Sequence, residues 1–441
     1  MTVPFVARLA GLVKQKTRVT MVDPCDMIVL GGGPAGAVSA WLAAREGLRV
    51  RLIDPCRESG RLEGLSPRLH HWLQQSGLGT GGSTLGPLPR RVDWGGETSR
   101  ANGEYILDRD RLDAHLRGAA QAEGAELVQG TGHLHDGRVT LAEGGEWTAR
   151  WVIDARGRRS HRAARHGAEF SSLSICGWYR TAPARIAGCA VSTLPEGWIW
   201  RADLADGRGW AQFTCDARSP LGLEERLMAA LQYVLPEAEV TLLAPPMARQ
   251  ATPVLPTEIA DLTCLPVGDA LAAMDPLSGH GLFWAVSSAL AAAAARRTLT
   301  ARPGATSETL CRRYLQERAA ATYLRNARIG RDFIRLEAHH AAQPFWAARA
   351  AFPDERLAHE VVSAPEIRPG LGVRGGLVEE MEMLHTPDHP EGVGWFGSVP
   401  AAALWRRIAE GASREALLAE HGPGIGRIYD GLCAHRAGVA A

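Results

Sequence analysis

The chain has 441 residues, of which 46% are hydrophobic and 22% are charged, and its formal net charge is +1. This composition is that of an ordinary globular protein, and the balanced charge gives no indication of a nucleic-acid partner. No apolar stretch reaches the roughly 20 residues that a membrane-spanning helix needs, so we expect no membrane partner. The eight cysteines form no CxxC pair, which argues against a metal site and is typical of reduced thiols in a cytoplasmic protein.

The chain begins with residues 1–20, which carry Arg and Lys without a clean apolar segment. We interpret them as a flexible extension and not as a signal peptide.

A glycine-rich turn follows the first apolar run of the chain. Gly31 would form the turn, Gly33 would let a pyrophosphate approach the backbone, and Gly36 would let a helix pack on a strand. The helix would begin at Pro34 and Ala35, where free N–H groups favour phosphate. The pattern predicts a strand, a tight turn and a helix that together bind a dinucleotide.

An acidic residue ends the next predicted strand. Asp54 is placed to accept hydrogen bonds from ribose hydroxyls, as in Rossmann-type domains. In the polar loop that follows, Arg57 is a candidate for contact with adenine or phosphate, and Glu63 for facing the reacting ring. Solvated loop charges explain both residues equally well.

The next part of the chain alternates between helices and short strands. We predict a helix over residues 68–78, a Gly/Pro-rich loop over 80–89, and a helix that begins near Arg109 and runs to about Glu123. A second strand-to-glycine turn contains Asp154 and Gly157.

Residues 171–259 change character to short alternating runs, which predict an antiparallel sheet that carries a substrate domain. Trp198 and Trp200 would share one face of a strand, where they line either an aromatic pocket or the core.

A third glycine turn, Gly268-Asp269, precedes a Gly-rich segment and a long Ala-rich helix that ends near Leu299. The helix start would offer N–H groups to an electron-poor carbonyl or an anion. His280 in this segment is a catalytic candidate, with a structural histidine as the alternative. Further helices are expected over residues 306–335 and 340–360.

These features predict an α/β protein with a Rossmann-type domain. We assign residues 21–170 and 260–364 to a dinucleotide-binding domain, with 171–259 as the inserted substrate domain. Residues 365–441 would form a small winged-helix-like module, without the basic stripe of a DNA binder, that docks a protein or caps the fold.

Taken together, the separated motifs resemble the single-component FAD monooxygenase superfamily, whose fold is shared by geranylgeranyl reductases and flavin-dependent halogenases. The resemblance covers about residues 26–360 and implies FAD as the cofactor. The motifs that carry it are Gly31, Gly33, Gly36, Asp54, Arg109, Asp154, Gly157, Gly268, Asp269, Pro276 and Gly279.

The resemblance also implies a role for each motif. Asp54 would hold the adenosine ribose, Arg109 would steady the cofactor, and Asp154 and Gly157 would lie near the pyrophosphate. Asp269 would bind the pyrophosphate or ribityl groups.

The turn from Pro276 through Gly279 to Gly281 would place backbone N–H groups at the pyrimidine end of the isoalloxazine ring. Such donors would stabilise negative charge on the reduced ring.

Within the superfamily, the segment Asp275-Pro-Leu-Ser-Gly-His-Gly281 is most similar to the halogenase-like branch. Halogenation uses a lysine beside the substrate, and this chain has no lysine after Lys16, which argues against it. Trp198-Ile-Trp200 matches the first half of a halogenase signature, but Arg201-Ala-Asp203 departs from the second half.

The chain therefore most resembles flavoproteins that mature tryptophylquinone enzymes. This implies a monooxygenase that adds two oxygens to a tryptophan indole in a small partner subunit, through O2 and a flavin C4a-hydroperoxide. NAD(P)H or an external electron donor would reduce the FAD. The alternatives left open are a small-molecule aromatic hydroxylase, a halogenase, a geranylgeranyl-reductase-like saturase and a non-catalytic scaffold.

Overall fold

The computed structural model describes residues 25–135, 137–142, 144–160, 167–182, 186–256 and 258–436. The predicted flexible extension over residues 1–20 lies outside them. No helix in these ranges is long and apolar enough to cross a membrane.

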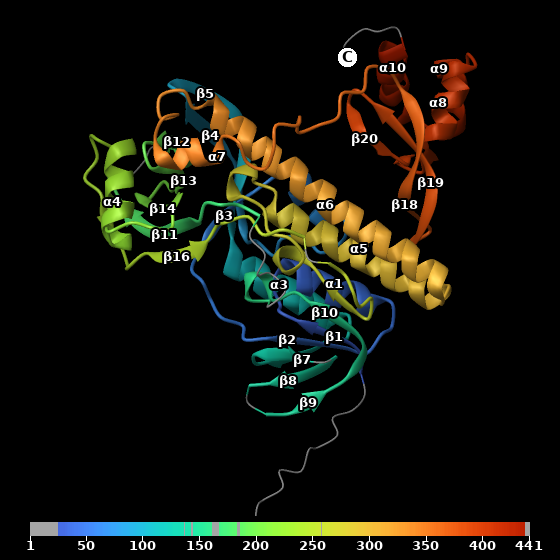
Figure 1. The fold of residues 1–441 in the computed structure, drawn as a ribbon, viewed down its shortest axis with the longest axis horizontal. Coiled ribbons are helices and arrows are strands. Elements are labelled where there is room, and N and C mark those ends of the chain that lie inside the picture. The colour runs from blue at the N-terminus through green and yellow to red at the C-terminus, as the bar shows by residue number, and fades with distance from the viewer. Residues whose placement is uncertain are drawn as a thin grey trace, which may run out of the picture.

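A five-stranded parallel sheet forms the base of the dinucleotide-binding part (Figure 1), with strand order β17-β10-β1-β2-β6. Because the strands run in one direction, their carboxyl ends meet at a single edge, which is where ligands bind in such sheets. The strands are β1 (Cys25–Leu30), β2 (Val50–Asp54), β6 (Glu126–Gln129), β10 (Ala149–Asp154) and β17 (Cys264–Pro266).

The two faces of this sheet are covered differently. Met27 and Val29 of β1 pack into a core shared with several helices, whereas Ile28 and Leu30 face a small antiparallel sheet. This alternation is expected for a strand buried on both faces. The helices include α1 (Pro34–Arg45), α3 (Arg109–Ala122) and α5 (Gly281–Ala301), and the small sheet is β7 (Gly132–His135), β8 (Arg138–Leu141) and β9 (Glu146–Trp147).

A second, nine-stranded sheet stands above the first and is largely antiparallel, as expected for residues 171–259. Its order is β15-β11-β14-β13-β12-β4-β5-β3, with β16 also paired to β11. Three of its strands come from the first third of the chain. The strands are β3 (Leu62–Leu65), β4 (Thr84–Trp94), β5 (Glu97–Asp108), β11 (Ser172–Arg180), β12 (Gly188–Leu194), β13 (Gly197–Asp203), β14 (Arg208–Asp216), β15 (Thr241–Leu242) and β16 (Met247–Gln250).

Helices cover both faces of the second sheet. On one face α4 (Leu223–Val234) packs against β11, β13 and β14. On the other, the end of α6 (Ala305–Leu336) and α7 (Pro344–Arg349) pack against the tryptophans of β13 and β14. The helix α2 (Pro67–Gln75) follows β3, close to the range predicted for it.

Two predicted elements are wrong. The segment 80–89 was expected to be a loop, but β4 begins at Thr84, because pairing with β5 and β12 outweighs its Gly/Pro content. Helix over 340–360 is limited to Pro344–Arg349. Pro353 has no N–H to continue a helix, and Asp354 is instead bound by arginines of α6.

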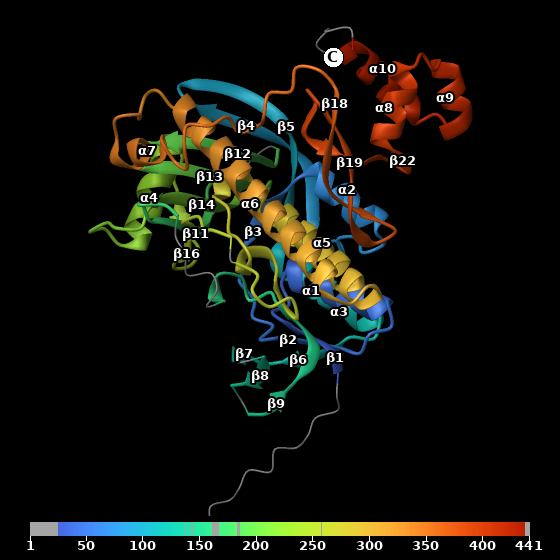
Figure 2. The same ribbon diagram turned by 45° about the vertical axis from the view of Figure 1, so that its right-hand side comes forward.

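The C-terminal module is a three-stranded antiparallel sheet with three helices, joined to the rest along α5 and α6 (Figure 2). Its strands were less evident from sequence than its helices, because the segment is rich in Gly, Pro and acids. The elements are β18 (Glu366–Arg374), β19 (Leu377–Thr386), β20 (His389–Val393), β21 (Trp395–Phe396), β22 (Val399–Pro400), α8 (Ala401–Ala409), α9 (Arg414–His421) and α10 (Ile425–Arg436).

Candidate functional site

The first glycine turn joins β1 to α1, and each glycine has a different environment. Gly31 has a φ of 100°, and a Cβ there would stand 2.4 Å from the carbonyl oxygen of Ala155. A Cβ on Gly36 would stand 1.8 Å from the carbonyl oxygen of Gly31, so helix and strand touch at this point. Gly33 faces open space, with no atom within 4 Å of a Cβ. The turn is therefore closed on its protein side and open at Gly33.

The start of α1 is suited to an anion. Gly33 is its N-cap, no side chain caps it, and Pro34 occupies the first turn. The first intrahelical bond here is donated by Ala37 to Gly33. The N–H groups of Ala35 and Gly36 precede this bond and point out of the helix start. A phosphate beside Gly33 would meet these donors and the positive end of the helix dipole.

Asp54 lies at the end of β2, beside this turn. Its carboxylate accepts hydrogen bonds from the backbone N–H of Gly32 at 2.6 Å and of Cys56 at 2.7 Å. The guanidinium of Arg117 lies 3.7 Å away. These contacts fix the carboxylate at the sheet edge with lone pairs left over for hydroxyl donors. Arg57 is exposed in the loop that follows.

Asp154 ends β10 and is completely buried. It accepts hydrogen bonds from Arg156 at 2.9 Å and from the Ser160 hydroxyl at 2.7 Å. Burial alone would raise the pKa of Asp154, but the hydrogen bonds and charge of Arg156 outweigh it and lower the pKa. The carboxylate thereby ties down the turn that contains Gly157, whose φ is 61°.

Gly268 and Asp269 follow β17 at the same edge. The N–H of Gly268 donates to the hydroxyl of Ser288 in α5, which fixes the backbone of the turn. The Asp269 side chain remains 42% exposed and lies 3.4 Å from the guanidinium of Arg158. Desolvation by the surrounding protein raises the pKa of Asp269, and the positive charge of Arg158 opposes that rise. An accessible carboxylate thus stands between the second and third glycine turns.

The turn before α5 is a short 3-10 helix, η4 (Pro276–Ser278), capped when Asp275 accepts the N–H of Leu277 at 2.8 Å. Gly279 has a φ of 64°, and neither it nor Gly281 has an atom within 4 Å of a Cβ. His280 is exposed and is the N-cap residue of α5. This turn also presents open backbone.

Glu63 and Arg109 form a buried ionic cluster. Arg109 donates to Glu63 at 2.7 Å and to Asp113 at 3.1 Å, and Arg61 lies 2.9 Å from the other oxygen of Glu63. Burial would raise the pKa of Glu63, but the charges of Arg109 and Arg61 lower it. Glu63 is therefore held as an anion with both oxygens engaged.

Trp198 and Trp200 share one face of β13, as predicted, and both are buried. They belong to a cluster with Ile106 of β5 and Trp346 of α7, and Leu277 of η4 packs against the same cluster. The structure thus joins the two tryptophans to the Pro276–Gly281 turn through one side chain.

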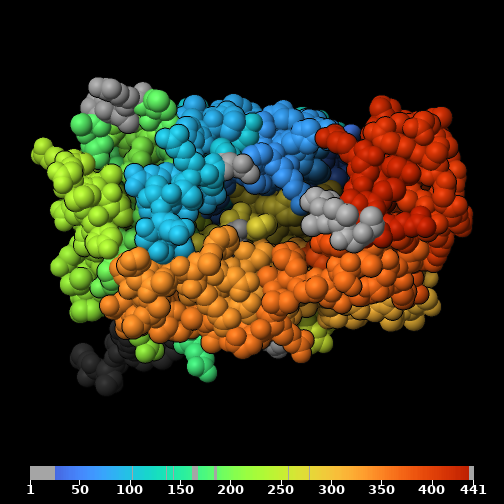
Figure 3. Space-filling model, turned by 90° about the horizontal axis from the view of Figure 1, so that it is seen from above, coloured from blue at the N-terminus to red at the C-terminus, as the bar shows by residue number. Residues whose placement is uncertain are grey.

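A hollow opens on the face of the molecule shown in Figure 3. Its walls are the cyan residues of β4 and β5, the orange residues of α6 and the red C-terminal module, and its floor has the olive colour of the region near η4. The opening is therefore bounded by the second sheet, α6 and the C-terminal module.

Several site residues were not singled out from the sequence. Arg61, Arg158 and Ser288 contact residues that the motifs did identify, whereas Ser160, which binds Asp154, closes the Asp154-x-x-Gly157-x-x-Ser160 motif itself. Only the pair Arg109–Asp113 carried a local signal, since residues four apart lie on one helix face.

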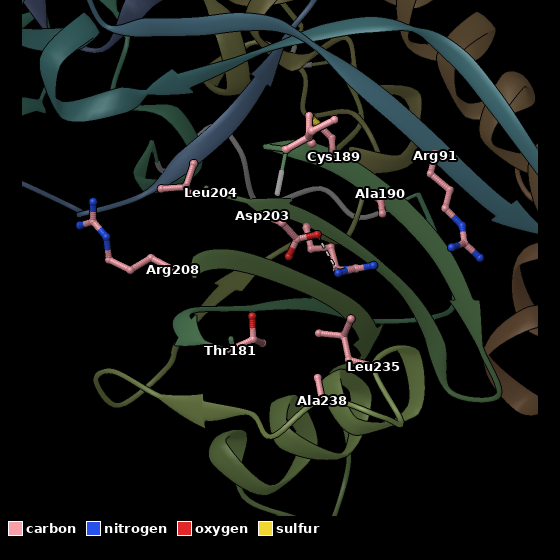
Figure 4. Close-up of a pocket in the computed structure, with 12 residues that line it drawn as sticks. Arg91, Thr181, Cys189, Ala190, Asp203, Leu204, Arg208, Leu235 and Ala238 are labelled. Carbon is pink, nitrogen blue, oxygen red and sulfur yellow. Dashed lines mark hydrogen bonds and ion pairs between the residues drawn. The ribbon is translucent and has the colours of Figure 1, made fainter. Parts of the chain in front are cut away.

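A second cavity, of about 300 Å³, lies at the ends of β12–β14 beside α4 (Figure 4). None of the predicted site residues lines it. Its arginines already have carboxylate partners within 2.8 Å, and we assign it no function. The pairs are Arg91–Asp93, Arg201–Asp203 and Arg208–Asp206.

The residues at the sheet edge fit FAD. Open backbone at Gly33, Gly279 and Gly281 would admit a ligand where any side chain would intrude. The carboxylates of Asp54 and Asp269 are placed to accept from ribose or ribityl hydroxyls.

Comparison with known proteins agrees with this geometry. No family model matches the chain. It is similar to the solved structure of QhpG, a peptidyl tryptophan dihydroxylase that is essential for tryptophylquinone cofactor biogenesis. The two chains are 33% identical, the match covers 92% of this chain and 98% of that chain, and the TM-score is 0.73. It is 27% identical to menaquinone reductase of Mycobacterium tuberculosis over 307 residues, which cover 59% of this chain and 73% of the reductase. It is 25% identical to tryptophan 2-halogenase of Chondromyces crocatus over 394 residues, which cover 76% of this chain and 71% of the halogenase.

Proposed function

We propose that this chain adds two oxygens to the indole of a tryptophan in a partner polypeptide. The premise is that it belongs to the family of FAD-dependent enzymes that contains the peptidyl tryptophan dihydroxylase QhpG. The chain is a flavoprotein oxidoreductase of the monooxygenase kind. The observation that carries the finer proposal is that the likeness runs over nearly the whole of both chains, and so includes the C-terminal module as well as the cofactor edge.

The cofactor would be held by the three glycine turns. Gly33 and the start of α1 would bind the pyrophosphate, Asp54 the adenosine ribose, and Asp269 the ribityl chain. Bound FAD, once reduced, would supply the activation of O2. Asp154 would act indirectly, by fixing the turn, because its carboxylate already accepts hydrogen bonds from Arg156 and Ser160.

The Pro276–Gly281 turn would present backbone N–H groups to the ring of the cofactor. Glu63 would position Arg109 and not move a proton, because both of its oxygens are bound by arginines. His280 remains the candidate for a proton donor, since it stands exposed beside the turn. The buried tryptophans of β13 would help to exclude water from the substrate side.

The domain roles follow the same proposal. The parallel sheet with its helices would bind the cofactor, the second sheet would contact the substrate, and the C-terminal module would dock the partner subunit. The reductant, NAD(P)H or an external electron donor, would act from solution.

The test is a mass measurement on the partner. The FAD-loaded protein is reduced with NADH or dithionite in the presence of a tryptophylquinone precursor subunit, air is admitted, and the subunit is weighed. A gain of two oxygen atoms on one tryptophan would support the proposal. An unchanged subunit, with the reductant consumed, would contradict it.

Two controls separate the related reactions. Chloride or bromide in the buffer tests the likeness to the halogenase, since a halogen mass on the tryptophan would replace hydroxylation by halogenation. Oxygen uptake tests the likeness to the reductase, since saturation of a double bond adds hydrogen and consumes no O2.

A further inference from the structure

Glu104 is a carboxylate on the face of the second sheet that carries Trp198 and Trp200, outside the cofactor motifs. It lies two residues from Ile106 on β5, so both side chains point to the same face. That face carries Trp198 and Trp200, and Leu277 of the turn before α5 packs against it. The Glu104 side chain is only 16% exposed. A largely buried carboxylate therefore lies on the same sheet face as the two tryptophans.

This carboxylate already binds an indole. Oε2 of Glu104 accepts a hydrogen bond from the ring N–H of Trp200 at 3.1 Å. The Arg90 guanidinium is 3.9 Å from the same oxygen, beyond hydrogen-bond distance. Glu63, by contrast, has an arginine within 3 Å of each oxygen. Glu104 is thus less neutralised than Glu63 and has the geometry to accept from an indole.

The second oxygen of Glu104 lies over a glycine. A Cβ on Gly64 would stand 2.0 Å from Oε1, so any larger residue at this position of β3 would displace the carboxylate. The absence of a side chain at Gly64 and the bond from Trp200 together fix the carboxylate in one orientation. Trp200 donates to Oε2, and the thiol of Cys189 on β12 lies beside the same carboxylate. The lone pairs of Oε1 can accept from a further donor.

We propose that Oε1 of Glu104 accepts a hydrogen bond from the indole N–H of the substrate tryptophan, and so orients its ring toward the Pro276–Gly281 turn. This inference rests on the proposed function. It makes Glu104 the residue that selects an indole with a free N–H over one that cannot donate. Hydrogen bonds to charged groups are strong enough for this bond to change affinity about tenfold or more.

The test compares two small probes that differ only at the ring nitrogen. Binding of 3-methylindole and of 1,3-dimethylindole to the oxidised, FAD-loaded protein is followed by calorimetry. We expect the wild type to prefer 3-methylindole by about tenfold or more, and Glu104→Leu to lose that preference. Glu104→Gln keeps an acceptor without the charge, and we expect it to retain a preference of about threefold.

A matched control lies on the same strand. Glu97 is exposed at the start of β5, and Glu97→Leu should keep the full preference of the wild type. If Glu104→Leu also keeps it, or if the wild type has none, the inference is wrong. Should Glu104→Leu fail to fold, an unchanged preference in Glu104→Gln, which keeps the volume of the side chain, would contradict the inference equally.

The experiments can reject the proposed function and the proposed role of Glu104 independently of each other. The mass of the partner subunit after reaction with the wild type decides whether the tryptophan is hydroxylated. The ratio of the two probe affinities decides whether Glu104 accepts a hydrogen bond from the indole N–H. A positive mass result with an unaltered ratio in Glu104→Leu would leave the function in place and remove Glu104 from it.

Discussion

Arg109 binds two carboxylates although its side chain is only 8% exposed. Burial lowers its pKa, and the charges of Glu63 and Asp113 raise it by more, so the guanidinium stays charged. Removing Arg109 would leave Asp113 charged without this counterion, and Glu63 with Arg61 alone. The loss of stability caused by a substitution here therefore depends on which buried charges are left without a partner.

We expect Arg109→Met to lower the free energy of unfolding by about 3–5 kcal/mol, because Asp113 loses the arginine that binds it and Glu63 is left with Arg61 alone. Urea denaturation of the FAD-free protein measures this. Arg111 lies on the same helix but is 72% exposed. Arg111→Met should stay within about 0.5 kcal/mol of the wild type. Equal effects of the two changes would show that the buried cluster adds no stability.

Asp154 predicts an acid-dependent loss of stability. Its lowered folded-state pKa means that its contribution is present above the unfolded pKa of about 4 and is lost as the pH falls through the folded pKa. Asp154→Asn should cost roughly 3 kcal/mol at pH 7, and the difference from the wild type should shrink below about pH 4. Urea unfolding between pH 7 and pH 3 measures it.

Asp26 provides the comparison for this experiment. Its pKa is also lowered, by hydrogen bonds from Arg49, but the pair is exposed. Asp26→Asn should cost less than about 1 kcal/mol at every pH. A difference for Asp154→Asn that does not change with pH would contradict the assignment of a charged, paired carboxylate.

Site residues could be predicted from sequence where the contact is local. Gly31, Gly33 and Gly36 lie within one turn, so their spacing alone indicates their geometry. Glu104 and Trp200 are 96 residues apart, and their hydrogen bond depends on the order of strands in the second sheet. No local pattern encodes that order, so Glu104 was missed.

At the scale of the element, the β1–α1 unit shows why its glycines are not equivalent. Gly36 is needed by the protein, because helix and strand touch there, whereas a Cβ on Gly33 would meet no protein atom within 4 Å and would affect only a bound ligand. Stability and cofactor binding should therefore respond differently to a methyl group at the two positions.

We expect Gly36→Ala to lower the melting temperature of the FAD-free protein, since its Cβ would stand 1.8 Å from a backbone oxygen. Gly33→Ala should melt close to the wild type but bind FAD at least about tenfold more weakly, as a lost charge-assisted contact would imply. Thermal unfolding and FAD fluorescence titration measure the two effects. A stable Gly36→Ala that binds FAD normally would overturn this view of the turn.

The element predictions failed where tertiary pairing outweighed composition. β4 contains Gly86 and Pro87, which favour a loop, yet it pairs with both neighbours in the sheet. Helix beyond Arg349 was expected from spacing, but Pro353 and the arginines of α6 that bind Asp354 keep that segment non-helical. Elements that depend mainly on their own residues, such as α1 and α6, were predicted within a few residues.

At the scale of the whole molecule, the β18–β19 hairpin belongs to two cores. Val378 at one end of β19 is buried with the helices of the parallel sheet, and its N–H donates to Thr298 of α5. Leu384 at the other end is buried with α8–α10. The C-terminal module is therefore anchored by apolar packing, and exposed ion pairs such as Arg302–Glu379 only supplement it.

We expect Val378→Asp to destabilise a larger part of the protein than Leu417→Asp. Both side chains are fully buried, but Val378 lies in the main core and Leu417 in the core of the C-terminal helices. Val378→Asp should destabilise the whole protein by at least about 3 kcal/mol, whereas Leu417→Asp should loosen only the C-terminal module. Hydrogen exchange with mass spectrometry maps both. Faster exchange throughout the chain in Leu417→Asp would show that the two cores unfold together.

The strand order of the parallel sheet also has a consequence for synthesis on the ribosome. The edge where Gly31, Asp154 and Gly268 meet is complete only when β17 has paired with β10. About 240 residues separate the first turn from the third, which at bacterial or eukaryotic elongation rates is roughly 10 to 50 s of translation. For the first part of that time β4 also lacks its partner in the second sheet, because β12 begins only at Gly188. Nascent chains that end before α5 should therefore retain no FAD and should be bound by chaperones.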